Sequence, residues 1–362
     1  NKMKMTELPI QWENHPASAL KLSPDLADEW DRLNAKRGDL PFLRAHAVVL
    51  ALDVFGNGSE RLLVARKNAT VEALFMVVPT GALRWQTFQP SQLPLGAWVS
   101  ESTLSPTDLV RSAMRGPLGF CLVFSVTQID PYLVLRGEET ADSHYGDYID
   151  TGWIDIAGSF DEYWSTRGKN LRQNMRKQRT KLASEGITLT MRSLYNPDQM
   201  APAVERYGTL ESSGWKAQEG TAIHGKNSQG VFYRTLLENS ALCDEAVIFE
   251  LLFGDRVVAI NLCLKSKKTL VVLKTTYDES IKSCSPAFLL RQMELEKFFQ
   301  EKYIERLEYY GRMMDWHTKL TECKRTLYHL TVYRFQILKR IAAWRRKMGN
   351  TRTRDAQLPL EA

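Results

Sequence analysis

The feature of the sequence that most constrains the fold is a series of three strand-like segments in its second half. Each is an apolar or alternating run rich in Val, Ile and Leu, and together they cover residues 245–253, 256–264 and 269–276. Only Gly254-Asp255 separates the first two, and such a pair is typical of a tight hairpin turn. These closely spaced strands predict an antiparallel meander.

After the meander, the sequence predicts a strand–helix–strand crossing. A polar loop leads to Ser285 and Pro286, which suit the N-cap and the first position of a helix over 287–301, and residues 304–310 predict a further strand. The free N–H groups and positive dipole end of such a helix suit a pyrophosphate. The candidate cofactor-binding residues are therefore Ser285, Pro286, Ala287, Phe288 and Leu289. The alternative is an ordinary capped helix without a ligand.

The first half mixes helical and strand patterns. Apolar residues recur at helical spacing over 24–36 and 104–115. Short apolar or alternating runs predict strands over 48–55, 61–65, 73–79, 119–127 and 132–136. With 362 residues, of which 44% are hydrophobic and 25% charged, the chain has room for two domains and the composition of a globular protein. We therefore expect an α/β (α+β) fold.

A turn-rich stretch over residues 146–158 suggests a domain boundary. The expected divisions are a first domain over 1–150, a second over 151–333, and a basic amphipathic helix and tail over 334–362. In the second domain, Ser159 is expected to cap one long helix that reaches about Ser184. A strand and two helices then follow over 187–192, 197–212 and 230–239.

Several classes of protein are disfavoured. No segment has the roughly 18 to 20 uninterrupted apolar residues that cross a bilayer, and the N-terminus lacks the apolar region of a secretory signal. The five cysteines include no Cys-x-x-Cys pair, and no His, Cys and carboxylate cluster has zinc-site spacing. Gly-x-Ser-x-Gly and Walker-type loops are also missing from the sequence. We expect a cytoplasmic protein without a metal.

Forty-eight basic and forty-two acidic residues give a net charge of +6, and the basic residues are clustered. One cluster covers 167–181, where the alternatives are a solvated helix face or an attraction for phosphates. The other covers 333–354 and mixes eight basic residues with Phe335, Ile337, Leu338, Ile341 and Trp344. This pattern suits a helix on an anionic membrane surface, but packing of its apolar side against the second domain fits it equally well.

Several spaced motifs give the chain a resemblance to a known family. They are Gly214-Trp215-Lys216, Gly220-Thr221-Ala222-Ile223, Phe232-Tyr233, the hairpin Leu-Phe-Gly-Asp-Arg-Val-Val-Ala, Lys274-Thr275-Thr276-Tyr277-Asp278 and Ser285-Pro286. In this order they resemble the CelD-like acyltransferases of cellulose and exopolysaccharide biosynthesis. These are relatives of the GNAT superfamily of acetyl-CoA-dependent N-acetyltransferases and of the Fem-type aminoacyl transferases. The resemblance is clearest over 159–330, and Ala287 stands where the family often has Gly.

The resemblance implies two GNAT-like domains in tandem, each a mixed, largely antiparallel sheet flanked by helices. It also implies acyl transfer from a thioester, with acetyl-CoA or another acyl-CoA as co-substrate. Such chemistry needs a base, an acid and an acceptor pocket. The candidates are Asp278 and Asp315 as base or amine-orienting carboxylates, Tyr277 or Tyr310 as acid, and Trp215, Lys216 and Lys319 for the acceptor. Each of them also has a structural alternative, such as packing for Trp215 or backbone capping for Asp278.

We therefore expect an acyl-CoA-dependent acyltransferase, by preference an N-acetyltransferase, acting on an amino sugar or related group of an exopolysaccharide or envelope precursor. The acceptor would be a small molecule or a carrier-linked sugar. Peripheral contact with the inner face of the membrane would come from the basic C-terminal helix. One alternative is a Fem-type aminoacyl transferase that uses charged tRNA. Another is a non-catalytic GNAT-like accessory of a polysaccharide synthase.

Overall fold

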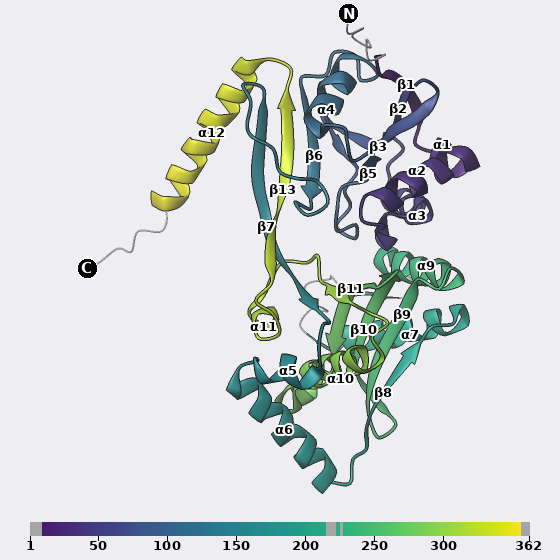
Figure 1. Cartoon of the computed structure of the whole chain (residues 1–362), viewed down its shortest axis with the longest axis vertical. Coiled ribbons are helices and arrows are strands. Elements are labelled where there is room, and N and C mark those ends of the chain that lie inside the picture. Colours follow the sequence, from purple (N-terminus) through teal and green to yellow (C-terminus); the bar gives the residue numbers. More distant parts are fainter. Residues whose placement is uncertain (1–8, 215–221, 225–226, 356–362) are drawn as a thin grey trace, which may run out of the picture.

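A computed structural model describes residues 9–214, 222–224 and 227–355, with side chains up to Met348. Its centre is one mixed sheet of thirteen strands, in the order β1-β2-β3-β4-β6-β13-β7-β12-β11-β10-β9-β8, with β5 pairing to β3. The strands form an upper and a lower half, and β7 runs through both (Figure 1). The expected α/β fold class, a mixed and largely antiparallel sheet flanked by helices, is confirmed.

The upper half holds the N-terminal strands β1 to β6 and the strand β13 from the far end of the chain. Their bounds are β1 Gln11–Pro16, β2 Arg61–Lys67, β3 Thr70–Gly81, β4 Arg84–Thr87, β5 Trp98–Ser100, β6 Val123–Ile129 and β13 Lys324–Tyr333. Its helices are α1 Ala19–Leu22, α2 Pro24–Lys36, α3 Ala45–Phe55 and α4 Pro106–Arg115, with the 3₁₀ turn η1 Pro41–Leu43. The long helix α12 Gln336–Asp355 follows β13 and stands away from the sheet (Figure 1).

The lower half holds the predicted meander and crossing. Its strands are β8 Leu189–Leu194, β9 Ala246–Phe253, β10 Arg256–Ser266, β11 Thr269–Tyr277 and β12 Arg306–Glu308. Its helices are α5 Phe160–Ser165, α6 Lys169–Ser184, α7 Pro197–Ser212, α9 Ser228–Leu242, α10 Pro286–Glu301 and α11 Asp315–Thr318, with the 3₁₀ turn η2 Glu279–Cys284. The Gly254-Asp255 hairpin joins β9 and β10 as expected, with Arg256 opposite Phe253.

Strand β7 (Ser143–Asp155) connects the two halves. It pairs with β13 over Ser143–Gly152 and then with β12 over Trp153–Asp155. The expected boundary at residue 150 therefore falls inside a strand that both halves share. The turns expected over 146–158 are wrong for most of that segment, because β7 is extended up to Asp155. Hydrogen bonds to β13 and β12 hold this glycine-containing segment in the extended conformation.

One hydrophobic core lies where the two halves meet. It joins Trp30, Phe42 and Val48 of the upper half to Tyr207, Phe232 and Ile248 of the lower half. The rings of Phe55 on α3 and Phe232 on α9 lie with their centroids 5.3 Å apart. Because apolar contacts and a continuous sheet both cross this boundary, the halves form one packed unit.

Three sequence predictions are corrected by the structure. Residues 48–55 belong to the helix α3, because an apolar run buried on several sides has no period that separates strand from helix. Residues 132–136 form a turn and coil around Tyr132 instead of a strand. The predicted long helix breaks into α5 and α6 near Gly168, where Ser165 and Thr166 hydroxyls donate to backbone carbonyls of the preceding turn.

The strand β13 is not among the elements expected from the sequence, none of which covers residues 324–333. Leu327, Tyr328, Leu330 and Val332 are all buried on it. Within the described residues, no helix is long and apolar enough to cross a membrane.

Candidate functional site

In the lower half, the predicted strand–helix–strand crossing is present as β11, η2, α10 and β12. The strands β11 and β12 are parallel, but they pair only between Thr269–Val271 and Arg306–Glu308. Beyond the last pair, β11 runs on to Tyr277 while β12 ends, so the ladder between the two strands opens after Val271. The loop that enters α10 follows directly from the diverging end of β11.

The N-terminus of α10 lacks a side-chain cap. Pro286 occupies the first turn as predicted, and no acidic residue lies there. Ser285 takes a left-handed conformation (φ 52°), and its hydroxyl accepts a hydrogen bond from Asn174 of α6 at 2.9 Å. The expected side-chain cap by Ser285 is therefore wrong, because this conformation directs its hydroxyl to α6. Leu289 donates its N–H to the Ser285 carbonyl at 3.1 Å, which leaves the first-turn amides of Ala287 and Phe288 uncapped by a side chain.

Helix α6 holds the loop before α10 in place. The Gln178 amide donates to the Ser283 carbonyl at 3.0 Å and to Asn174 Oδ1 at 3.1 Å. The next residue, Arg179, donates to Gln292 of α10 at 3.0 Å. These polar contacts fix the loop relative to the uncapped turn, so that its backbone is organised before any ligand arrives.

Asp278, a candidate base, uses both carboxylate oxygens in structural contacts. Oδ1 accepts from the Ser280 N–H at 2.9 Å and from the Ser280 hydroxyl at 2.6 Å, and Oδ2 accepts from Arg256. Burial alone would raise the pKa of Asp278, but these hydrogen bonds and the Arg256 charge hold it below its ordinary value. This geometry favours the capping alternative for Asp278.

The two tyrosine candidates lie in different surroundings. Tyr277, at the end of β11, is half-buried, and burial together with Glu279 raises its pKa. Tyr310 is buried against Phe42, with ring centroids 5.2 Å apart, and the Arg325 guanidinium lies 4.9 Å from its ring centre. Burial, Glu308 and Asp130 raise the pKa of Tyr310 well above 10. Both hydroxyls therefore stay protonated at neutral pH, and Tyr277 is the more accessible of the two.

The acceptor candidates that the structure describes lie beside the first turn of α10. Lys319 Nζ is 5.7 Å from the centre of the Phe288 ring and 3.7 Å from the carboxylate of Asp315. Both charged side chains are exposed, so their ion pair is weak. Trp215 and Lys216 lie outside the described residues.

His317, another titratable group nearby, is structural. Its Nδ1 accepts a hydrogen bond from the Met314 N–H at 2.8 Å, and its ring stacks on Trp316. Burial and the Arg291 charge lower the pKa of His317 to about 4, so it is neutral at physiological pH.

A buried charged cluster that is not expected from the sequence lies at the end of β12. Arg325 of β13 donates to both oxygens of Asp130 at 2.9 Å and to Glu308 Oε2 at 2.9 Å. Burial and the neighbouring Asp130 raise the pKa of Glu308 to about 7, although Arg325 opposes the shift. The single guanidinium of Arg325 thus pairs with two carboxyl groups, and Glu308 remains protonated up to near neutral pH. The alternation within 324–333 was the signal that would have placed Arg325 on a strand.

The upper half contains a second crossing of the same kind, built from β4, α4 and β6. Strands β4 and β6 are parallel and pair only over Arg84–Gln86 with Val123–Ser125. In this half, the segment around Gly96 lies beside the end of β6. The Gly96 N–H donates to the Gln128 carbonyl at 3.4 Å, and a Cβ on Gly96 would lie 2.5 Å from the Thr127 carbonyl oxygen. Residues 88–97 therefore fill the position that would receive a ligand in this half.

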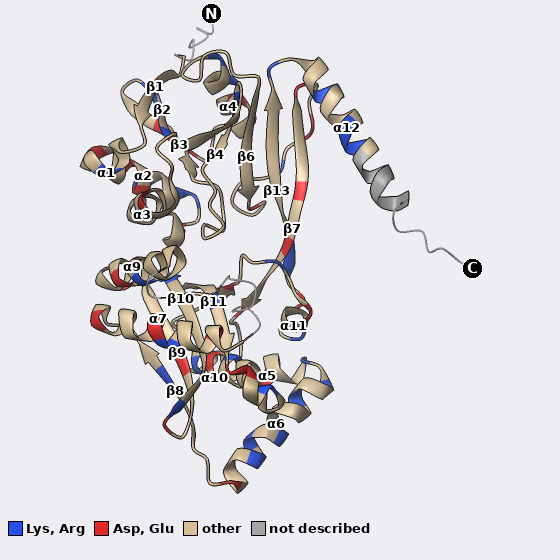
Figure 2. Cartoon of the chain, turned by 180° about the vertical axis from the view of Figure 1, so that it is seen from behind, with Lys and Arg blue, Asp and Glu red and all other residues tan. Residues whose placement is uncertain are grey.

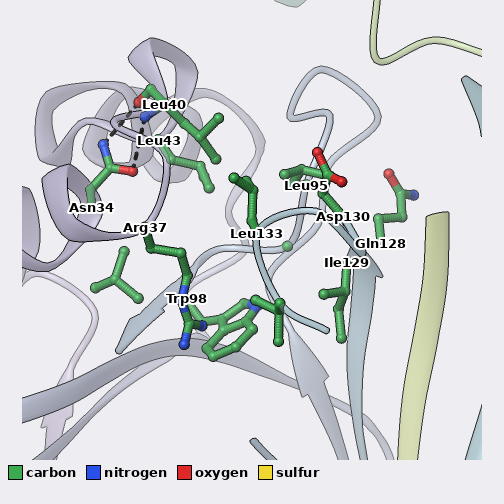
Figure 3. Close-up of a pocket in the computed structure, with 13 residues that line it drawn as sticks. Asn34, Arg37, Leu40, Leu43, Leu95, Trp98, Gln128, Ile129, Asp130 and Leu133 are labelled. Carbon is green, nitrogen blue, oxygen red and sulfur yellow. Dashed lines mark hydrogen bonds between the residues drawn. The ribbon is translucent and has the colours of Figure 1, made fainter. Parts of the chain in front are cut away.

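The N-terminus of α4 also differs from that of α10. The Ser105 hydroxyl accepts from the Asp108 N–H at 3.3 Å, and the Asp108 carboxylate lies in the first turn. Nearby, Arg37, Trp98 and Asp130 line a cavity of about 20 Å³ (Figure 3). That volume suits a single water molecule, so it does not hold a nucleotide-sized ligand. Because the first turn of α10 is uncapped and that of α4 is capped, the lower half is the better candidate for the working site.

Residues 169–318 match the family model described as an acetyltransferase (GNAT) domain. This match lies in the lower half of the molecule, and the uncapped helix α10 is inside it. No curated protein matches significantly.

Solved structures show the same fold at low identity. The C-terminal domain of a putative lysylphosphatidylglycerol synthetase from Agrobacterium fabrum is 13% identical, with a TM-score of 0.50 over 78% of this chain and 86% of that one. A FemX structure is 8% identical, with a TM-score of 0.51 over 78% of this chain and 90% of that one. Because these likenesses cover most of both chains, they extend the shared fold beyond the matched domain.

Proposed function

We propose that this protein is an acyl-CoA-dependent acyltransferase, by preference an N-acetyltransferase, whose donor site lies at the divergence of β11 and β12. The observation that carries the proposal is the uncapped first turn of α10 at the diverging end of β11, within the GNAT match. Acyl-CoA would supply an activated thioester. The residues present fit it, because free amides and the positive helix end suit a pyrophosphate and no carboxylate occupies the first turn.

Each residue of the site has a definite contribution in this proposal. The amides of Ala287 and Phe288 hold the pyrophosphate, while Ser285 and Pro286 shape the turn that exposes them. Tyr277, protonated at neutral pH, is the acid at the end of β11. Lys319 stands beside Phe288 and, together with its ion-pair partner Asp315, would contact the acceptor.

The acceptor we propose is an amino sugar or related group of an exopolysaccharide or envelope precursor, free or carrier-linked. Lys319 would attract an anionic part of such a precursor, and Asp315 would orient an amine. Both side chains are exposed, and Lys319 stands next to Phe288 in the first turn of α10, which supports their use in binding.

The first test is isothermal titration of the purified protein with acetyl-CoA, CoA and a longer acyl-CoA. We expect micromolar binding, together with loss of binding when a carboxylate enters the first turn of α10. Absence of binding to all three ligands would refute the acyl-CoA proposal. Among the described residues no group of three or more His, Cys, Asp or Glu could hold a metal ion, so the titration is run without added metal.

A second candidate is a Fem-type transferase that draws on charged tRNA. The exposed basic face of α6, made by Lys169, Arg176, Lys177 and Lys181, favours it, because this helix also holds the loop before α10 (Figure 2). This alternative predicts affinity for tRNA that falls steeply with salt and no binding of CoA. The same titration, repeated with charged tRNA at two salt concentrations, separates the two candidates.

A further inference from the structure

Helix α12 is attached to the upper half through the side that carries Lys339, where Leu338, Ala342 and Ala343 are also half-buried. Lys339 Nζ donates to Glu139 Oε2 at 3.0 Å and to the Thr140 carbonyl at 2.7 Å, and Arg346 donates to the Tyr333 hydroxyl at 3.4 Å. Its packing partner is β13. The apolar side of the helix is thus turned away from the sheet, and the helix projects outward (Figure 1).

The opposite side of α12 is apolar and exposed. Ile337, Ile341, Trp344 and Met348 follow the spacing of one helix face and have exposed fractions of 57%, 42%, 62% and 49%. We call these four residues the α12 face. Phe335, at 47%, lies just before the helix and packs against Phe120, at 54%, with their ring centroids 6.3 Å apart. A row of four large apolar side chains exposed on one helix face marks an interaction site.

Basic residues border the α12 face. At 3.6 residues per turn, Arg345 lies on one flank, and Arg340 and Lys347 lie on the other. All three are exposed, and the sequence from Arg334 to Met348 contains no Asp or Glu (Figure 2). The border is therefore uniformly positive.

We propose that the α12 face docks on an anionic lipid surface. The four apolar side chains enter the boundary between headgroups and acyl chains, and Arg340, Arg345 and Lys347 contact lipid phosphates. A uniformly basic border complements anionic headgroups, and an exposed Trp is favoured at a membrane interface. Attachment through Lys339 and Arg346 on the back of the helix holds the rest of the protein above the bilayer. This surface lies outside the GNAT match, so the inference is independent of the proposed donor site.

The test is co-sedimentation of the full chain with vesicles of phosphatidylcholine mixed with phosphatidylglycerol, and with vesicles of phosphatidylcholine alone. We expect binding to the mixed vesicles that weakens as salt rises, and little binding to the neutral ones. The variant Ile341→Glu/Trp344→Glu should lose binding. Arg340→Gln and Arg345→Gln should each lower the partition coefficient about fivefold.

The matched control is Leu22→Glu/Leu242→Glu, which replaces two exposed leucines, at 76% and 74%, on α1 and α9. It adds the same charge as the α12 variant and should bind vesicles like the unaltered chain. Equal loss in both double variants, or no binding of the unaltered chain to the mixed vesicles, would overturn the proposal. If the unaltered chain does not bind vesicles but forms dimers that Ile341→Glu/Trp344→Glu disrupts, the α12 face contacts a second copy of the chain. That result would also overturn the lipid proposal.

Discussion

At the scale of single residues, the chemistry of a side chain depends on where its hydrogen bonds go. Asp278 and Ser285 were both selected from sequence for their types. In the structure, the Asp278 carboxylate caps the turn η2 and pairs with Arg256, while the Ser285 hydroxyl accepts from α6 instead of capping α10. Sequence therefore located this loop correctly, but the direction of each side chain follows from contacts with β10 and α6.

The capping function of Asp278 predicts a contrast between two substitutions. Asp278→Asn keeps a good capping side chain, and we expect turnover close to that of the unaltered protein. Asp278→Ala should lower the free energy of unfolding by about 1 kcal/mol. The measurements are steady-state kinetics and urea unfolding. A fall in turnover of about 100-fold or more in both variants, with donor affinity intact, would instead make Asp278 a catalytic base.

Glu308 predicts a pH dependence of stability. Its pKa is about 7 in the folded chain against 4.5 for an ordinary Glu, so folding takes up a proton between these values. This proton uptake contributes up to about 3 kcal/mol to the free energy of unfolding. The contribution is fully present below pH 4.5 and is lost as the pH rises through 7. Urea unfolding at pH 5 and pH 8 measures it.

The matched variants are Glu308→Gln, which removes the titration, and Glu305→Gln, an exposed neighbour paired with Lys268. We expect the loss between pH 5 and pH 8 to shrink in the first variant and to persist in the second. An unchanged loss in Glu308→Gln would show that another group titrates.

At the scale of elements, local signals located α10 well. Pro286 is the first residue of α10, as Pro24 is of α2 and Pro197 is of α7, because proline suits the first helical position. The runs for β9, β10 and β11 were also found within one or two residues. The helix α3 was missed, since its apolar run has no distinguishing period and its form depends on packing against α9.

The uncapped end of α10 predicts a change that separates ligand binding from stability. Ala287→Glu places a carboxylate in the first turn, where it should abolish CoA binding by competing with the pyrophosphate. The helix dipole tolerates that charge, so the melting temperature should stay nearly unchanged. Titration calorimetry and thermal unfolding measure the two effects. Gln300→Glu, which adds the same charge near the other end of α10, should bind normally; retained CoA binding by Ala287→Glu would move the donor site elsewhere.

At the scale of the whole molecule, the two halves are linked through β7 and β13. The strand β13 enters the upper sheet between β6 and β7, although the rest of that sheet is formed by residues 11–155. It also brings Arg325 to Asp130 and Glu308, so that the charged cluster joins segments from three parts of the chain. The last segment of the chain therefore completes the fold of the first.

This arrangement predicts a sharp difference between two truncations. A chain that ends at residue 323 lacks the buried Leu327, Tyr328, Leu330 and Val332, whose burial is worth roughly 6 to 12 kcal/mol, comparable to the whole stability of a domain. We expect its upper half to remain unfolded in circular dichroism and limited proteolysis. A chain that ends at Arg334 lacks only the helix α12 and its tail and should melt within a few degrees of the full chain. Equal melting of both truncations would contradict this account.

By itself, the sequence determined the elements with local signals and the class of fold. The three-strand meander, the Gly254-Asp255 hairpin and the proline-started α10 all depend on residues close in the chain. Only the tertiary structure decided the placement of β13, the filling of the upper crossing by residues 88–97, and the exposed side of α12. The physical reason is that strand pairing, buried charge and side-chain direction depend on partners far away in sequence, which no local pattern specifies.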